Sequence, residues 1–263
     1  MNSSRRAMTI AEVLVSIGLF SMLMLLAATF ANQGQQLWRS VSGAGDANLQ
    51  IKKAARLLNQ DLTESNFINM ATTTVPASLA PAKDGSAIWM LSCVNPTTGA
   101  PVLKSDGSPF WQRNVLYYIV IPQGVSMVGE ADSRGFEVRC PNKVLIRKVI
   151  DSGNPTTPAS DPVVDSEKLM SASEINNYLT RPVGKNISAM SSEPNVQDVQ
   201  LLAHDLLSFE ADLRPDEDFL TEVQIVLRAV NFESARKDGG IGNASLRDSI
   251  HTLTLLLSVY PRN

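Results

Sequence analysis

The sequence predicts an α+β fold in which one long N-terminal helix packs on an antiparallel β-sheet head. Three observations support this prediction: an uncharged apolar run near the N-terminus, apolar residues at helical spacing beyond it, and short strand-like runs after Pro76. The chain has 263 residues, of which 44% are hydrophobic. This size and composition suit one globular domain with an appendage.

The first predicted element is an apolar transmembrane helix over residues 8–31, which follows a short basic leader at residues 1–7. Residues 13–31 are 19 positions without a charged side chain. A helix of this length spans roughly 28 Å, close to the ~30 Å hydrocarbon core of a bilayer. Arg5 and Arg6 precede the run, and positive charge beside a membrane helix tends to stay in the cytoplasm. We therefore expect a single membrane span with a cytoplasmic N-terminus and the rest of the chain outside.

Glu12 is the feature of this run that a simple membrane anchor does not explain. A carboxylate that faces hydrocarbon costs about 2.5–3.5 kcal/mol. A secretory signal cleaved after Ala31 would explain the basic start, but its apolar region is typically about 7–15 residues long. A twin-arginine export signal shares only the arginine pair with this segment. An uncleaved signal anchor explains the length and the arginines and leaves Glu12 as an uncompensated cost.

The second predicted element continues the helix through residues 32–70 as an amphipathic segment. Apolar side chains recur there at spacings of three, four or seven, which places them on one face: Leu37, Val41, Ala44, Ile51, Ala55, Leu58 and Leu62. Gly43 and Gly45 each cost about 0.5–1 kcal/mol relative to Ala, so we expect a bend or local melting there. The helix is expected to end near Asn69, before Pro76.

Residues 71–263 are expected to form a β-rich head. Runs rich in β-branched and aromatic residues predict strands at 86–92, 114–122, 134–140, 142–150, 204–213, 219–231 and 248–260. The runs 134–140 and 142–150 are expected to form a hairpin through Pro141 and Asn142. Residues 151–168 have the composition of a loop. A short helix is expected at 171–181, where Ser171 and Glu174 have the spacing of a capping box.

The charge of the chain argues against direct binding of nucleic acid. The formal net charge is −3 and the pI is near 5.5. Removing Arg5 and Arg6 lowers the net charge to −5. The chain therefore has a basic start before the apolar run and an acidic body after it.

Two cysteines, Cys93 and Cys140, lie near predicted strand ends and are 47 positions apart. An exported head would lie in a compartment that permits a disulfide between them. Closing a loop of this size stabilises a domain by roughly 4 kcal/mol in the chain-entropy model. The alternative is two separate buried thiols. We favour the disulfide, because an even number of cysteines in an exported domain is otherwise unexplained.

The sequence contains no recognisable catalytic or metal-binding motif, so we expect neither enzymatic activity nor a cofactor. His204 and His251 are the only histidines, and no Cys-x-x-Cys or His-x-x-x-His spacing indicates a zinc site. No serine lies in a Gly-x-Ser-x-Gly motif, and residues 239–242 lack the strand-then-helix setting of a phosphate-binding loop. A glycine-rich turn is the better interpretation of that segment.

Residues 6–14, Arg-Ala-Met-Thr-Ile-Ala-Glu-Val-Leu, resemble the processing signal of type IV pilins and type II secretion pseudopilins. In that family a prepilin peptidase removes a short basic leader after a small residue, usually Gly. The new N-terminal residue is N-methylated, and the fifth residue of the mature chain is Glu. The resemblance implies cleavage between Ala7 and Met8, N-methylation of Met8, and Glu12 as the fifth residue. Thr9 matches the common second residue, whereas Ala7 replaces Gly and Met8 replaces the more frequent Phe.

The resemblance also implies a role for Glu12 in assembly. The family's assembly model pairs this carboxylate with the N-terminal amine of a neighbouring subunit, here that of Met8. Such a pair would offset the cost of burying either charge alone. It would also penalise subunits that dock at the wrong height. The alternative is an intrachain contact, because residues four apart on a helix are neighbours.

The order of segments in the head is similar to that of J-type minor pseudopilins and W-type minor pilins. The similar segments are LYYI at 116–119, LIRK at 145–148, LLAHDLLSFEADL at 201–213 and, on the long helix, ARLLNQDL at 55–62. This resemblance implies a structural subunit of a type II secretion pseudopilus or a type IV pilus that helps to initiate or cap the filament tip. Its implied partners are the prepilin peptidase, other minor and major pilins or pseudopilins, and the inner-membrane assembly platform. Its implied location is the bacterial inner membrane, with a periplasmic head, and later the filament.

Some pseudopilins carry calcium in acidic loops, and two acidic clusters are the places to consider here. One cluster surrounds Pro215 and the other lies in the loop at 151–168: Asp212, Asp216, Glu217 and Asp218, and Asp161, Asp165 and Glu167. Neither cluster has a defined ligand spacing, and solvated turns have the same composition. We therefore expect no bound metal.

Two other functions fit part of the sequence. A pilus-tip adhesin would use the same scaffold and would carry an exposed aromatic or charged pocket in the head. A secreted binding protein or hydrolase would have an ordinary signal peptide, cleaved near Ala31, and a catalytic or binding constellation in the head.

Overall fold

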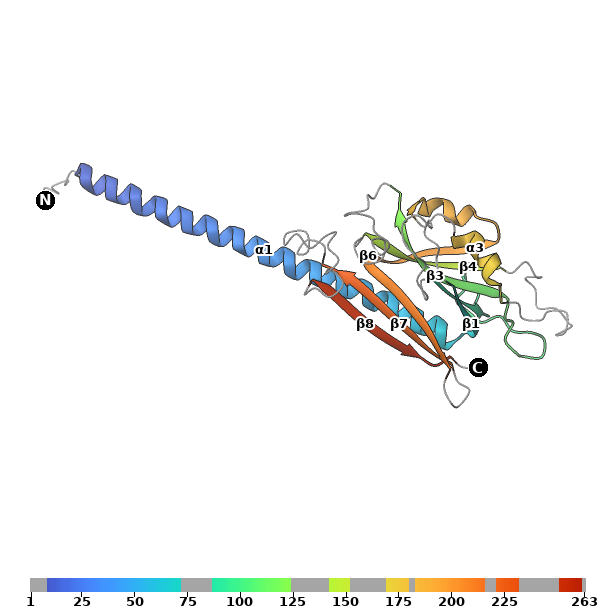
Figure 1. Ribbon diagram of the computed structural model, residues 1–263. Helices are drawn as coiled ribbons and strands as arrows, with labels where there is room; N and C mark the ends of the chain where they lie inside the picture. The colour runs from blue at the N-terminus through green and yellow to red at the C-terminus, as the bar shows by residue number, and fades with distance from the viewer. Residues whose placement is uncertain are drawn as a thin grey trace, which may run out of the picture. The chain divides into compact units, whose positions relative to one another are not determined.

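The first described element is α1 (Ile10–Thr63), a helix of 54 residues. The computed structural model of the chain describes residues 9–71, 87–123, 142–151, 169–179, 183–215, 221–231 and 251–261. The chain divides into two compact units, Met1–Ser42 and Gly43–Asn263, and α1 contributes residues to both. Figure 1 shows the helices and strands of each unit.

In the first unit, every described residue is exposed. α1 is the one helix in the described part of the chain that is long and apolar enough to cross a membrane. Its length and composition therefore agree with the predicted apolar helix near the N-terminus.

The second unit contains a sheet whose neighbouring strands follow the order β1-β2-β3-β4-β6-β7-β8 and pair antiparallel. A short strand, β5, pairs in parallel with the end of β3. The strand bounds are β1 Asn66–Ala71, β2 Ala87–Ser92, β3 Arg113–Pro122, β4 Lys143–Asp151, β5 Val183–Lys185, β6 Val196–Pro215, β7 Thr221–Val230 and β8 Thr252–Val259. The helix α3 spans Ala172–Leu179 and the 3₁₀ helix η1 spans Ile187–Ser192. A long N-terminal helix with an antiparallel sheet confirms the predicted α+β fold.

The central strands β2, β3 and β4 are covered on both faces. On one face their side chains join a core with the α1 residues Ala47, Ile51, Ala54, Leu58 and Leu62. On the other face they pack with side chains of α3 and η1. A strand covered on both faces can be apolar throughout, and β2 and β4 accordingly bury every residue.

Strands β7 and β8 have the alternating pattern of a sheet that is covered on one face. In β7 the residues Val223, Ile225, Leu227 and Ala229 join the core with α1, and the residues between them are half-buried. The side chains that point to the other face are mostly polar. The two halves of the sheet therefore require different sequence patterns.

The predicted end of the long helix near Asn69 is wrong. α1 ends at Thr63, and residues 66–71 form β1, which pairs with β2. The side chain of Ile68 packs against the same core as the apolar stripe of α1. Pairing with β2 satisfies the backbone groups of this segment.

The predicted hairpin between 134–140 and 142–150 is not formed along β4. Residues 134–140 lie outside the described residues, and β4 pairs with β3 on one edge and with β6 on the other. Both edges of β4 are therefore occupied by strands that are distant in sequence. The predicted loop at 151–168 begins one residue too early, because Asp151 is the last residue of β4, and residues 152–168 lie outside the described residues.

The predicted short helix is confirmed as α3, together with its capping box. The Ser171 backbone N–H and hydroxyl both donate to Glu174 Oε2, each at 2.8 Å, and the Glu174 backbone N–H lies 3.4 Å from Ser171 Oγ. Ile175, Tyr178 and Leu179 turn inward and fix α3 on the sheet.

Local melting at Gly43 and Gly45 is not observed, because both residues are helical within α1. Gly43 is required by a close approach instead. A Cβ atom at Gly43 would lie 2.5 Å from Oδ1 of Asn231, which is buried just after β7. Among the described residues, no atom lies within 4 Å of the corresponding position at Gly45. Gly43 therefore allows α1 to pass the end of β7.

We predict that Gly43→Ala destabilises the head by about 1–2 kcal/mol. Overpacking costs about 1–3 kcal/mol, and the higher helix propensity of Ala returns about 0.5–1 kcal/mol. Gly45→Ala is the matched control and is expected to stabilise by about 0.5–1 kcal/mol, because only the propensity changes. Equilibrium urea unfolding of the full chain in detergent measures both variants. Equal stabilisation by both would show that the approach of Asn231 does not matter.

Candidate functional site

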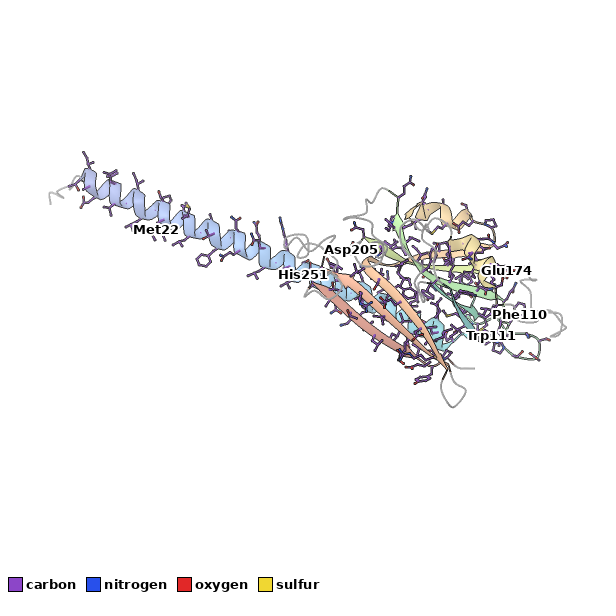
Figure 2. All side chains as sticks on the ribbon, in the orientation of Figure 1. Met22, Phe110, Trp111, Glu174, Asp205 and His251 are labelled. Carbon is purple, nitrogen blue, oxygen red and sulfur yellow. The ribbon has the colours of Figure 1, made fainter. Side chains whose placement is uncertain are left out.

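The apolar part of α1 is the most unusual surface of the first unit. Its large hydrophobic side chains are 41% to 82% exposed: Ile10, Val13, Leu14, Val15, Ile17, Leu19, Phe20, Met22, Leu23, Met24, Leu25, Leu26 and Phe30. Figure 2 shows such side chains projecting on all sides of the helix, Met22 among them. A helix that is apolar all round requires an apolar environment, either hydrocarbon or other helices.

Two hydroxyl side chains within this run, those of Ser16 and Thr29, are bonded to the helix itself. Ser16 Oγ donates to the Glu12 carbonyl oxygen and Thr29 Oγ1 donates to the Leu26 carbonyl oxygen, each at 2.7 Å. Such bonds satisfy a hydroxyl without an external partner, which lowers the cost of placing it in an apolar environment. These two polar residues are therefore compatible with burial of the run.

Glu12 caps the start of α1. Its Oε2 accepts hydrogen bonds from the Thr9 backbone N–H at 2.9 Å and from Thr9 Oγ1 at 3.1 Å, and its own N–H lies 3.3 Å from Thr9 Oγ1. Residues 9–12 therefore form a capping box. Its Thr-x-x-Glu spacing is visible in the sequence, but we did not predict the capping box from it. Glu12 therefore has an intrachain partner, Thr9, three positions before it. The intrachain alternative expected from the sequence, a contact four positions away with Met8, involves a residue outside the described ones. Oε1 accepts no hydrogen bond from any described residue.

The predicted processing site lies outside the described residues. Ala7 and Met8 both precede residue 9, where the description begins. Cleavage between them, N-methylation of Met8 and an intermolecular partner for Glu12 stay predictions.

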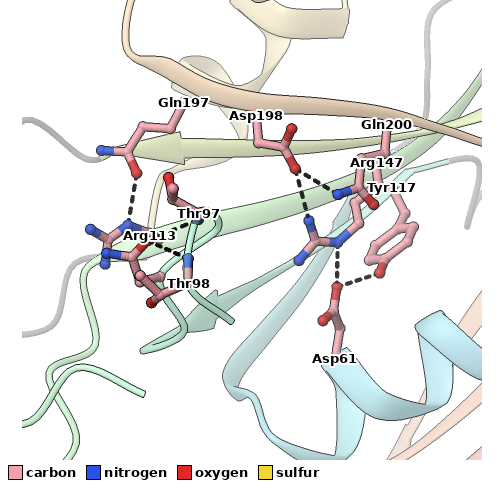
Figure 3. A network of polar contacts seen from close by, with 10 residues as sticks. Asp61, Thr97, Thr98, Arg113, Tyr117, Arg147, Gln197, Asp198 and Gln200 are labelled. Carbon is pink, nitrogen blue, oxygen red and sulfur yellow. Dashed lines mark hydrogen bonds and ion pairs between the residues drawn. The ribbon is translucent and has the colours of Figure 1, made fainter. Parts of the chain in front are cut away.

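In the second unit, Asp61 of α1 joins a polar network on the sheet (Figure 3). Arg147 Nε of β4 donates to Asp61 Oδ2 at 2.6 Å, and the Tyr117 hydroxyl of β3 donates to the same oxygen. Arg147 Nη1 lies 3.6 Å from Asp198 Oδ2, which also accepts from Gln200 Nε2 at 2.8 Å. The side chains of Asp61 and Arg147 are each 10% exposed. The network therefore links α1 to three strands of the sheet, β3, β4 and β6.

The electrostatics of this network favour its paired form. Burial raises the pKa of Tyr117 well above its ordinary value, and the charge of Asp61 adds to this shift, so the hydroxyl stays a donor. Burial alone would lower the pKa of Arg147, but the hydrogen bond and charge of Asp61 outweigh it and the pKa is raised. The groups satisfy one another, and their evident role is to hold α1 on the sheet.

A second buried cation lies on the opposite face of β4. Lys148 is fully buried, and its Nζ bonds with the Glu193 carboxylate and lies 3.3 Å from the Tyr178 carbonyl oxygen. The same Nζ lies 5.3 Å and 5.8 Å from the ring centroids of Tyr118 and Tyr178. Lys148 therefore attaches α3 and the segment after η1 to the sheet.

Cys93 is buried and holds a free thiol in the structure, and burial raises the pKa of this thiol. Cys140 lies outside the described residues. The predicted Cys93–Cys140 disulfide stays a prediction.

The candidate metal-binding residues do not gather into a site in the described part of the chain. No three His, Cys, Asp or Glu side chains among the described residues lie together in a way that could hold a metal ion. Asp212 pairs with Arg214 at 2.9 Å, whereas residues 161–167 and 216–218 lie outside the description. His204 is exposed beside Asp205, and His251 directly precedes β8.

Comparisons of the chain with models of protein families, with curated proteins and with solved structures found no match. The family resemblance therefore depends on residues 6–14 and on the looser patterns in the head.

Proposed function

We propose that the chain is a minor pilin or pseudopilin, a structural subunit that is held in the inner membrane by α1 and then built into a short filament. The observation that carries this proposal is the construction of α1. Its first part is apolar on all sides and exposed, and its last part belongs to the core of a sheet-containing head. A subunit that moves from a bilayer into a bundle of like helices needs such an element, because both environments are apolar.

The N-terminal residues supply the second support. Glu12 is the only charged residue between the leader arginines and Arg39, and it lies five positions into the chain that would begin at Met8. In this proposal the prepilin peptidase cuts between Ala7 and Met8, and Glu12 pairs with the Met8 amine of a neighbouring subunit. A pair of buried opposite charges is far less costly than either charge alone.

The head would act by contact rather than by catalysis. Asp61, Arg147 and Lys148, three charged groups with little exposed side-chain surface, are engaged in ion pairs that hold the helices on the sheet. A head of this size is bulky for a major subunit, so we place the chain among the minor subunits that initiate or cap the tip. Its partners would be other minor and major subunits and the inner-membrane assembly platform.

The mature N-terminus tests the proposed function. We expect intact-mass and N-terminal peptide analysis to find N-methylated Met8 in cells with an active prepilin peptidase and residues 1–7 retained in cells without it. A chain beginning at Asn32 would contradict the proposal and indicate a secreted protein. A chain that keeps its leader despite an active peptidase would contradict it as well.

A further inference from the structure

A groove of about 840 Å³ lies between the last part of α1 and the first half of β6, entirely within the second unit. Its α1 side and its β6 side together present basic, apolar and amide side chains: Leu49, Lys52, Lys53, Arg56, Leu57, Gln60, Gln200, Leu201 and Leu202. Among the described residues, the lining of the groove has three cationic side chains and no carboxylate. The network around Asp61 does not use these cations.

The three cations lack acidic partners among the described residues. Lys52, Lys53 and Arg56 are exposed and make no ion pair with any described carboxylate. The helix neighbours three and four positions away from each of them are uncharged or basic. Arg56 lies four positions after Lys52 and three after Lys53, and like charges at these spacings repel. An anionic partner would relieve this repulsion.

The groove also exposes large apolar side chains. Leu49 is 65% exposed and Leu201 is 40% exposed, on opposite walls of the groove. Leu57 and Leu202 also line the groove. A ligand that offers charge alone would leave this apolar surface in water. The lining therefore matches a partner with both carboxylates and apolar side chains.

The spacing along α1 indicates the form of that partner. The α1 residues that line the groove recur every three or four positions, which places them on one face of the helix: 49, 52, 53, 56, 57 and 60. A face of this kind accepts an amphipathic helix lying alongside it, with anchors at the same spacings. The same face of a second copy would be repelled, because it carries the same three cations.

We propose that this groove binds an acidic amphipathic helix from a different protein subunit. Carboxylates of that helix pair with Lys52, Lys53 and Arg56, and its apolar side chains cover Leu49 and Leu201. The inference rests on the proposed function, since it makes the groove a contact between unlike subunits of one filament. Complementary charge at such a contact selects the correct neighbour and orders assembly.

Photo-crosslinking of the full chain in its native host tests the proposal. The photoreactive residue p-benzoylphenylalanine replaces Leu49 or Leu201, and Leu103, 49% exposed in the loop after β2, serves as the matched control position. We expect mass spectrometry to map the crosslink from the groove to a helical segment of another envelope protein that carries Asp or Glu at spacings of three or four. The combined change Lys52→Glu, Lys53→Glu and Arg56→Glu should lower the yield about tenfold or more, as expected for loss of complementary charge.

Three further variants keep the result interpretable. Arg39→Glu reverses a single charge at an exposed α1 position outside the groove and should leave the crosslink unchanged. Lys52→Gln, Lys53→Gln and Arg56→Gln remove the charges without adding new ones and should also lower the yield, which protects against misfolding of the reversed variant. Changing the partner's carboxylates to Lys should restore the crosslink of the charge-reversed chain.

Three results would overturn the proposal: a crosslink to phospholipid, a crosslink to another copy of this chain, or a yield that does not depend on the three cations. The mature N-terminus, determined in the same sample, separates this inference from the proposed function. Met8 at the N-terminus without the acidic crosslink would refute only the groove. The acidic crosslink on a chain that begins elsewhere would refute only the pilin proposal.

Discussion

Arg147→Met is expected to destabilise the head by about 3–5 kcal/mol. Met fills a similar volume, but it leaves the Asp61 carboxylate buried without the guanidinium that pairs with it, and only the Tyr117 hydroxyl still donates to this carboxylate among the described residues. An uncompensated buried charge is strongly destabilising. The loss should also free the last two turns of α1 from β4, so that proteolysis near residue 61 becomes faster.

Equilibrium urea unfolding of the full chain in detergent measures this effect, and Arg214→Met is the matched control. Arg214 pairs with Asp212 at 2.9 Å, but both side chains are more than half exposed, so its loss should cost less than about 1 kcal/mol. Adding Asp61→Leu to Arg147→Met should recover much of the stability, because the unpaired charge is then gone. If Arg147→Met costs no more than Arg214→Met, the network does not hold α1 on the sheet.

Glu12→Gln is expected to abolish assembly while leaving the start of α1 capped. Gln can replace Glu in a capping box, so the bonds from Thr9 to this side chain can be kept. Only the charge is lost, and with it the partner proposed for the Met8 amine of a neighbour. Truncating one member of a buried charge pair costs about 2–5 kcal/mol, which corresponds to at least a roughly thirtyfold loss of association.

Thr9→Val is the complementary variant, because it removes the capping hydroxyl and keeps the charge. It should fray the first turn of α1 at a cost of about 1 kcal/mol and leave assembly intact. The amount of this subunit in sheared surface fractions, and its co-purification with differently tagged subunits, measure assembly of both variants. Normal assembly of Glu12→Gln would mean that Glu12 serves only as an intrachain cap.

Features set by local spacing could be predicted from the sequence. Each of these features has its signal within a short stretch of sequence. They are the uncharged run at 13–31, the capping box at Ser171 and Glu174, and the apolar runs that form β3 and β7. In these segments local propensity and the final packing agree, which is why the pattern was sufficient.

Features that depend on distant partners could not be predicted. The helix was expected to extend to about Asn69, and only pairing with β2 makes residues 66–71 a strand. The sequence indicates only that Gly43 weakens a helix, because its close approach to Asn231 depends on how distant segments pack. Asp61 and Arg147 are 86 positions apart, and no local pattern indicates that they meet. The same distinction applies to the candidate site. Glu12 could be identified from its position in the sequence, whereas the groove could not, because it is lined by residues of both α1 and β6.

The inclusion of Leu58 and Leu62 of α1 in the core of the head has a mechanical consequence. A tension applied along α1 would reach the sheet as shear, spread over these two side chains, the other α1 residues in the same core and the Asp61–Arg147 ion pair together. A head attached by a flexible tether would instead be loaded through one stretch of backbone. Contacts loaded in parallel share the force, so the helix can be pulled or pushed without peeling the sheet open strand by strand.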